Sequence, residues 1–157
     1  MSALLTHLLL ALAWMAVNGS FSFTDLVVGL VLGLLVMSIA SPFQAERGYA
    51  GRIWQGLGFL LWFLKELWVS SIKVARDILT PRLRARPGVI AVPLDAETDL
   101  EITMLACLVT LTPGTLSLDV SPDRKVLYIH AMFVDDPDAI RAEIKDGMEK
   151  RLLEVMR

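Results

Sequence analysis

The stretch Thr98–Val120, TDLEITMLACLVTLTPGTLSLDV, decides the fold of the C-terminal half of this chain. It opens with a capping box, because Thr98 and Glu101 can each accept a hydrogen bond from the other's backbone N–H. The helix that follows is apolar on nearly every side, so we expect it to be covered on more than one side. The triplet Thr112–Gly114 ends the helix, and an alternating strand begins at Thr115. The stretch therefore predicts a helix, a tight turn and a strand.

Strands and a helix flank this stretch on both sides. A short apolar strand, Val89–Leu94, precedes it, and Pro93 suits a sheet edge or the end of a strand because proline lacks a backbone N–H. A second alternating strand, Val126–Val134, follows the first across a short turn. Asp136-Pro137 has the residues that begin a helix, with aspartate as cap and proline at the first position. The buried stripe of this helix comprises Ile140, Ile144, Met148, Leu152 and Val155. The order of elements is βαββα.

A regular ladder across the four-residue loop Pro122–Lys125 fixes the expected register of the two alternating strands. The apolar pairs are Val120 with Leu127, Leu118 with Ile129, and Leu116 with Ala131. The opposite face pairs Asp119 with Tyr128, and Ser117 with His130. We therefore expect one apolar core face and one polar face.

Charge divides the chain into two parts. Residues 1–81 hold five of the 15 Lys and Arg and four of the 17 Asp and Glu residues, in a chain that is 55% hydrophobic. This split predicts a membrane domain over 1–81 and a cytosolic α/β domain over 82–157. The net charge of −2 gives no reason to expect nucleic acid as a partner. Cys107 is the only cysteine, which excludes an internal disulfide and a cysteine-based metal framework.

Two uncharged runs predict a membrane α-helical hairpin, with short transmembrane helices over about 1–17 and 25–41. Asn18-Gly19-Ser20 suits the turn between them, and Thr24 or Asp25 is placed to cap the second helix. The runs extend roughly 22–26 Å, which is short against a hydrocarbon core of about 30 Å. A signal peptide is the alternative for the first run, since Ala11-Leu12-Ala13 resembles a cleavage site, but a basic start is missing and a second apolar run follows.

A long third helix is predicted over about 53–80. It becomes amphipathic from Lys65 onward, because Glu66, Ser70, Lys73 and Asp77 recur along one helical stripe. The tryptophans Trp54, Trp62 and Trp68 would anchor such a helix at the membrane interface. The helix could equally span the bilayer with its polar stripe against a partner, and the sequence leaves both arrangements open.

Charged residues around this helix bear on orientation and function. Arg82, Arg84 and Arg86 follow the helix and are expected to lie on the cytoplasmic side, in contact with anionic lipid. Lys65 and Glu66 are candidates for a role linked to ions, because ionisable groups at membrane depth are functional by default. The alternative is that their charges reach out to the lipid headgroups.

No residues form a catalytic constellation, so the sequence predicts neither an enzyme nor a cofactor or metal site. Asp119 and His130 are expected to be diagonal neighbours on the polar sheet face beside Tyr128, which suits an acid/base pair or a face that contacts a partner. The loop Thr112-Pro113-Gly114-Thr115 is too short for a phosphate loop and lacks lysine. It is either a helix stop or a rigid loop that docks a neighbouring protein.

The segment Pro87–Val155, together with the helical part before it, resembles the E subunit of the Mrp-type (Mnh or Pha) monovalent cation/proton antiporters. The sequence blocks TDLEI, LVTLTPGT and LSLDV within Thr98–Val120 and YIHAM at Tyr128–Met132 carry this resemblance. The resemblance covers essentially the whole chain, and the C-terminal half carries most of its specificity.

The resemblance implies a multi-pass subunit of a bacterial plasma-membrane complex whose C-terminal domain is cytoplasmic. Its partners would be the other antiporter subunits and the lipid bilayer, and the complex would exchange Na⁺ for protons. The E subunit would then be an accessory or assembly component, while larger subunits carry most of the ion path. The alternative from the residues alone is a stand-alone, membrane-tethered module that binds a soluble partner through its polar sheet face.

Overall fold

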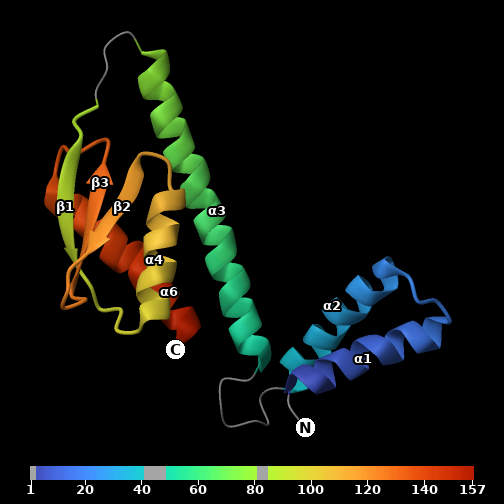
Figure 1. Cartoon of the computed structure of the whole chain (residues 1–157). Helices are drawn as coiled ribbons and strands as arrows, with labels where there is room; N and C mark the ends of the chain where they lie inside the picture. The colour runs from blue at the N-terminus through green and yellow to red at the C-terminus, as the bar shows by residue number, and fades with distance from the viewer. Residues whose placement is uncertain (1–2, 41–48, 81–84) are drawn as a thin grey trace. The chain divides into compact units, whose positions relative to one another are not determined.

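The computed structural model describes residues 3–40, 49–80 and 85–157 (Figure 1). The N-terminal part contains the helices α1 (Ala3–Asn18), α2 (Phe23–Ala40) and α3 (Tyr49–Leu79). The C-terminal part contains β1 (Gly88–Pro93), α4 (Asp99–Leu111), β2 (Thr115–Val120) and β3 (Val126–Ala131), and then α5 (Pro137–Ala142), the π-helical segment η2 (Glu143–Glu149) and α6 (Lys150–Met156). The expected helices and strands are all present, with their ends shifted by a few residues.

The chain divides into two compact units, Met1–Leu57 and Gly58–Arg157. This division falls inside α3, whereas the sequence placed it after residue 81. The reason is that Phe59, Trp62 and Phe63 of α3 pack against the hydrophobic core of the α/β domain. Most of α3 is thus a structural part of the C-terminal unit, and the assignment of each segment to membrane or cytosol stays a prediction.

In the first unit, α1 and α2 approach closely because α2 has glycines where it meets α1. A Cβ atom added to Gly29 would lie 2.8 Å from the carbonyl oxygen of Ala11, and one added to Gly33 would lie 2.9 Å from the ring of His7. Ala11 is fully buried at this contact. Small residues that allow backbones to touch are typical of helix pairs in apolar surroundings.

Polar side chains add hydrogen bonds to this helix pair. His7 is buried, and its Nε2 lies 2.8 Å from the carbonyl oxygen of Leu30, which can only accept, so Nε2 carries a proton. The other ring nitrogen lies 3.2 Å from the Tyr49 hydroxyl. The turn has Gly19 at a φ of 66°, as its glycine predicts. Helix α2 begins at Phe23, two residues earlier than expected. Its cap is Ser22 and not Thr24 or Asp25, because the Ser22 hydroxyl accepts the backbone N–H of Asp25.

Among the described helices, α2 alone is long and apolar enough to cross a membrane by length and composition. Helix α1 is apolar but has 16 residues, which extend about 24 Å against a hydrocarbon core of about 30 Å. The number of spans therefore remains a prediction.

The second unit has a three-stranded antiparallel sheet in the order β1-β3-β2, with helices over one face (Figure 1). The central strand β3 places Leu127, Ile129 and Ala131 in the core, all at most 2% exposed. Leu105 of α4, Met148 of η2 and Phe63 of α3 belong to the same buried cluster, so three helical segments share one sheet face. Strand β1 lies at the edge of this sheet and ends at Pro93, so both positions that the proline suggested apply.

The predicted register of β2 on β3 is right near the turn and wrong beyond it. Val120 lies opposite Leu127 and Asp119 opposite Tyr128, as expected. A β-bulge at Leu118 then shifts the ladder by one residue. Beyond the bulge Ser117 lies opposite Ile129, and Leu116 lies opposite His130. Ser117 therefore takes the core side, and Leu116 and Leu118 are 45% and 50% exposed.

Helix α4 is covered on one side rather than on several. Its capping box is present as predicted, with the Thr98 hydroxyl accepting the Glu101 N–H and the Glu101 carboxylate accepting the Thr98 N–H. Leu105 and Val109 are buried, but Leu100, Met104 and Leu111 are 63%, 43% and 61% exposed. The apolar outer side of α4 thus has no cover within the described part of this chain.

The cap of α4 is also tied to the end of the chain. Arg157 donates to the Glu101 carboxylate, with 2.9 Å between Nε and Oε1, while the backbone N–H groups of Thr98 and Glu97 donate to the same carboxylate. These bonds, that of Arg157 first, lower the pKa of Glu101 from 4.5 to about 2. The carboxylate therefore stays ionised at every pH at which a cell lives.

A second buried carboxylate joins the loop after β1 to the last helices. Glu149 is 1% exposed, and its Oε1 accepts the backbone N–H groups of Asp95 (2.7 Å) and Ala96 (2.9 Å). Its Oε2 lies 3.2 Å from Nζ of Lys145, which also contacts the Asp95 carboxylate at 3.0 Å. Burial alone would lower the pKa of Lys145, but the hydrogen bonds with Asp95 and Glu149 outweigh it and raise that pKa.

The last helix runs from Pro137 to Met156 with a π-helical segment in its middle. Asp136 caps it by accepting the Asp138 N–H, and Pro137 stands in the first turn, as predicted. Of the predicted stripe, Ile144, Met148 and Leu152 are buried. π-Helical segments are rare and are found disproportionately at functional sites.

Candidate functional site

The loop Thr112-Pro113-Gly114-Thr115 packs against its own chain. The Thr115 hydroxyl lies 2.7 Å from the Val109 carbonyl oxygen and 2.9 Å from that of Thr112, so it closes the end of α4. Gly114 has a φ of 92°, and a Cβ added there would contact Val74 of α3 and Phe133. The local geometry is that of a helix stop, and docking of a partner on this loop stays a prediction.

The outer sheet face carries Asp119, Tyr128 and His130, as the sequence indicated, but it is not simply polar. The bulge adds Leu116 and Leu118 to its exposed surface, and Val89 of β1 is 62% exposed. The Asp119 carboxylate accepts the backbone N–H of Val120 at 2.8 Å. In the described part of the chain no hydrogen bond joins Asp119 to His130, so the structure does not assemble an acid/base pair there.

The charged residues that the sequence linked to the membrane differ in their surroundings. Lys65 is exposed, whereas the neighbouring Glu66 is half-buried and lines a cavity. Arg86 is exposed and lies 3.7 Å from Asp135, a surface ion pair that contributes little to stability. Arg82 and Arg84 lie outside the described residues.

The polar stripe of α3 faces the α/β domain. Glu66, Ser70 and Lys73 line the cavity, and Asp77 is 5% exposed. The opposite side of α3 is apolar and exposed, and it includes Leu60, Leu61, Leu64, Trp68 and Ile72. The helix thus has apolar residues on two sides, because Phe59, Trp62 and Phe63 pack against its own domain while this second apolar side points away from it.

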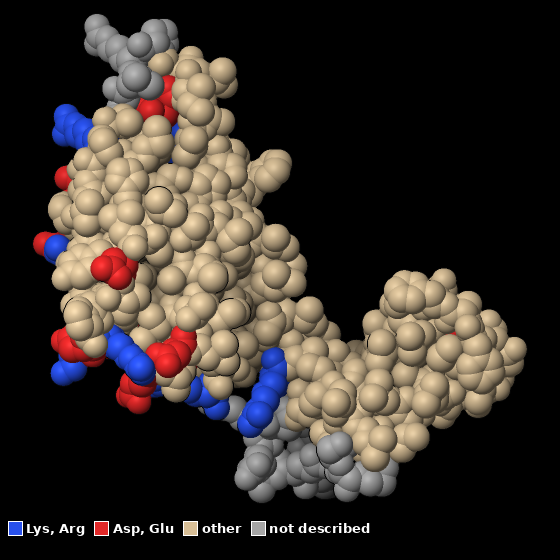
Figure 2. Space-filling view, in the orientation of Figure 1, with Lys and Arg blue, Asp and Glu red and all other residues tan. Residues whose placement is uncertain are grey.

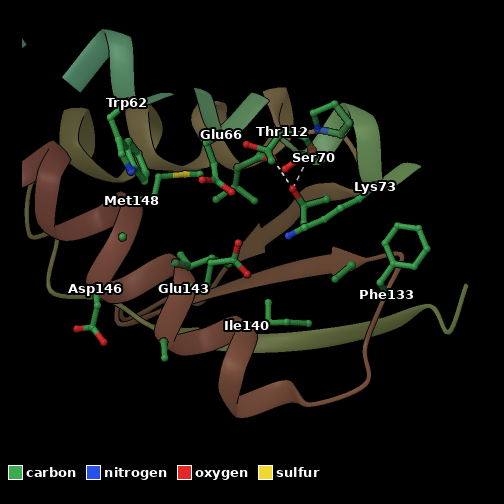
Figure 3. Close-up of a pocket in the computed structure, with 18 residues that line it drawn as sticks. Trp62, Glu66, Ser70, Lys73, Thr112, Phe133, Ile140, Glu143, Asp146 and Met148 are labelled. Atoms are coloured by element: carbon green, nitrogen blue, oxygen red, sulfur yellow. Dashed lines mark hydrogen bonds between the residues drawn. The ribbon is translucent and has the colours of Figure 1, made fainter. Parts of the chain in front are cut away.

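The cavity lies between α3 and the helix pair α5–η2 and has a volume of about 390 Å³ (Figure 3). Thr112–Thr115 and Phe133 complete its wall. The side chains of Glu66, Lys73 and Glu143 point into it, while Asp146 points away. The sequence had identified the α3 residues as one stripe, but Glu143 carries no local signal that could have linked it to them.

A second hollow, which we name the α4 groove, runs between α4 and β2. Its lining is uncharged and comprises Ile102, Thr103, Ala106, Cys107, Thr110, Leu111, Ser117 and Val120. Figure 2 shows charged side chains gathered at the margins of this unit, with an uncharged area over α4. Thr110 Oγ1 accepts the backbone N–H of Ser117 at 3.2 Å, which occupies a donor of the β2 edge. The groove is thus suited to side-chain packing and not to the addition of a strand.

Clusters of three or more His, Cys, Asp or Glu side chains suited to a metal ion are absent from residues 3–40, 49–80 and 85–157. The features that remain are an apolar helix pair, a long helix with an exposed apolar side, and an α/β domain with an uncharged groove. Together they define a small protein with an apolar helical part and a compact α/β domain.

The chain belongs to the Na⁺/H⁺ ion antiporter subunit family, whose sequence model matches residues 7–155. It is 36% identical to the E subunit of the Na⁺/H⁺ antiporter of Alkalihalophilus pseudofirmus, over 97% of this chain and 96% of the relative. It is also 36% identical to the corresponding E subunit of Bacillus subtilis, over 98% of both chains. These matches confirm the resemblance to the E subunit drawn from the sequence.

Two solved structures are similar to this chain. A chain of the Mrp complex from Dietzia sp. DQ12-45-1b superposes with a TM-score of 0.52 and 37% identity, covering 64% of this chain and 94% of that one. A chain of the membrane-bound sulfane sulfur reductase, an archaeal respiratory membrane complex, superposes with a TM-score of 0.59 and covers 98% of both chains. That second likeness is at 24% identity and shows a shared fold alone.

Proposed function

We propose that this chain is a structural subunit of a multisubunit Na⁺/H⁺ antiporter and holds neighbouring subunits together without carrying the main ion path. Family membership supports the antiporter, and the exposed α4 groove supports the structural role. Burial of an uncharged groove against another protein gains hydrophobic stabilisation without desolvating charges.

The membrane helices offer little chemistry for an ion path. Helices α1 and α2 contain one formally charged residue, Asp25, beside the turn between them, and one histidine, His7, whose ring nitrogens contact Leu30 and Tyr49. The Asp25 carboxylate accepts hydrogen bonds from the hydroxyls of Ser20 and Ser22, so it stabilises that turn. Proton and cation paths across membranes depend on series of ionisable groups. Larger subunits of the complex would therefore supply the path.

We further propose two spans, α1 and α2, with α3 at the cytoplasmic surface and the α/β domain in the cytosol. The exposed apolar side of α3, with Trp68 72% exposed, would lie in the lipid, while its polar stripe lies under the α/β domain. Spanning by α3 would place Lys65, Glu66 and Lys73 near the bilayer, at about 2.5–3.5 kcal/mol for each charge at its centre.

Single cysteines at positions 20, 47 and 84 test this placement. Because Cys107 is exposed, the labelling requires a Cys107→Ala background. We expect a membrane-impermeant maleimide to label position 20 from outside the cell and positions 47 and 84 only in everted vesicles. Labelling of position 47 in intact cells would show that α3 spans, and would overturn the interfacial placement.

Substitution in the α4 groove tests the structural role. Leu111→Glu places a charge on a side chain that is 61% exposed, so the domain should fold, but docking would bury an unpaired carboxylate. In cells that carry the whole antiporter, we expect the tagged variant to copurify at least tenfold less of the other subunits. Na⁺-dependent proton exchange in everted vesicles should fall in parallel.

Val89→Glu is the matched control, since Val89 is 62% exposed on the other sheet face. It should leave copurification and exchange near wild type. A Leu111→Glu chain that copurifies every subunit but has lost exchange would instead assign this chain to the ion path. A wild-type chain that purifies alone in mild detergent would support the stand-alone binding module.

A further inference from the structure

The cavity between α3 and α5–η2 has no part in the structural role proposed above, yet its size and lining are those of a ligand site. Its volume of about 390 Å³ lies within the range of small-molecule sites, roughly 300–1,000 Å³. Ile140, Ile144 and Phe133 give it apolar walls. All of its lining residues belong to the compact unit Gly58–Arg157, so one body of the protein builds it.

Three charged side chains converge in this cavity without neutralising one another. Glu66 and Lys73 enter from α3, and Glu143 enters from η2 on the opposite side (Figure 3). The ion pairs found among the described residues involve none of these three groups. Glu66 is half-buried, while Lys73 and Glu143 are also exposed to solvent at the cavity mouth, so two carboxylates and one ammonium group are available to a ligand that has charges of both signs.

Ser70 adds a buried polar group on the same wall. It is 7% exposed and lines the cavity, and its hydroxyl can either donate a hydrogen bond to a ligand or accept one from it.

We propose that this cavity binds the headgroup of an aminophospholipid, such as phosphatidylethanolamine. The primary ammonium would lie between Glu66 and Glu143, and the phosphodiester would contact Lys73 and the Ser70 hydroxyl. A primary ammonium has three N–H donors for two carboxylates, and hydrogen bonds between charged groups are the stronger ones.

Other headgroups fit this lining less well. An anionic headgroup would meet two carboxylates and one lysine, and would be repelled. A choline headgroup has no N–H to donate and is best held on an aromatic face. Of the two aromatic side chains that line the cavity, Trp62 already holds the Arg151 guanidinium at 4.9 Å from its ring centroid, which leaves Phe133 as the single aromatic partner for a choline group.

We infer that the ligand is a lipid because α3 forms one wall of the cavity and exposes the apolar side chains of Leu64 and Trp68 on its other side. This step rests on the proposed placement of α3 at the bilayer surface. Binding is measured on the purified chain, so its failure is distinguishable from failure of the structural role, which is read in the assembled complex.

The test uses the full chain in a neutral detergent, with phosphatidylethanolamine, phosphatidylcholine and phosphatidylglycerol of identical acyl chains. Affinity is measured by native mass spectrometry, and stabilisation by the shift in melting temperature. We expect phosphatidylethanolamine to bind at least tenfold more tightly than the other two lipids. Lys73→Gln and Glu143→Gln should each weaken that binding at least tenfold, while the controls Lys65→Gln and Glu154→Gln, which lie outside the cavity lining, leave it unchanged.

The double variant Glu66→Gln with Glu143→Gln separates headgroup recognition from a loss of folding. With both carboxylates neutralised and Lys73 retained, its preference should change to phosphatidylglycerol. Equal binding of the three lipids by the wild-type chain would overturn the proposal, as would unchanged preference in the double variant. Equal stabilisation by soluble glycerophosphoethanolamine would show that the ligand is a free phosphate ester and not a lipid.

Discussion

Replacing Glu149 by alanine is expected to lower the free energy of unfolding of the α/β domain by about 3 kcal/mol or more. The substitution leaves the backbone N–H groups of Asp95 (part-buried) and Ala96 (buried) without this acceptor, and it removes one of the two carboxylates that neutralise Lys145. Hydrogen–deuterium exchange of the β1 and β3 amides in the full chain measures the effect, since exchange of core strands follows global unfolding.

Two control variants separate the parts of this effect. Glu149→Gln keeps a carbonyl oxygen for the two N–H groups and loses the charge, so it should have roughly half the effect or less. Glu154→Ala removes an exposed carboxylate from the same helix and should stay within about 0.5 kcal/mol of wild type. Wild-type exchange in the Glu149→Ala chain would show that this carboxylate does not hold the loop after β1.

Gly29→Leu is expected to separate α1 from α2 and to lower the stability of the helix pair by about 3 kcal/mol, the upper end of the usual cost of overpacking. The first added carbon already lies 2.8 Å from a backbone oxygen and 3.0 Å from Cα of Ala11, and backbone atoms cannot move aside alone. The measurement is unfolding of the purified chain by SDS titration, followed by the helical circular dichroism signal.

Gly58→Ala is the matched control in α3, because a Cβ added there meets nothing within 4 Å. Glycine in a helix interior is less stable than alanine by roughly 0.5–1 kcal/mol, so this variant should be slightly more stable than wild type. A Gly29→Leu chain that unfolds at the wild-type SDS concentration would contradict the close packing of α1 on α2.

Local signals in the sequence predicted the elements well. The capping box at Thr98, the proline at the start of the last helix and the alternation in β3 each depend on residues within one or two turns of one another, so no knowledge of the rest of the chain was needed. The polar stripe of α3 was predicted for the same reason, since helical periodicity places those residues on one side.

Features that depend on distant segments were not predicted. The register of β2 failed because the prediction assumed an unbroken ladder, whereas a bulge at Leu118 accompanies hydrogen bonds from Ser117 to α4. Glu149 could not be singled out, because the backbone N–H groups that it accepts lie more than 50 residues earlier in the chain. The direction of the α3 stripe was open for a similar reason, since periodicity names a side of a helix but not what covers it.

The π-helical segment η2 has a consequence for the rotational phase of the last helix. Its apolar side chains Ile140, Ile144, Met148 and Leu152 repeat every four residues. In a regular α-helix, with 3.6 residues per turn, each such step overshoots one full turn by about 40°, so three steps would turn Leu152 about 120° away from Ile140. The wider turns of η2 take up the excess rotation, and Ile144, Met148 and Leu152 all reach the core. An apolar repeat of four residues thus indicates that a helix needs wider turns to keep these side chains on one side. In this protein the wider turns begin at Glu143, which lines the cavity.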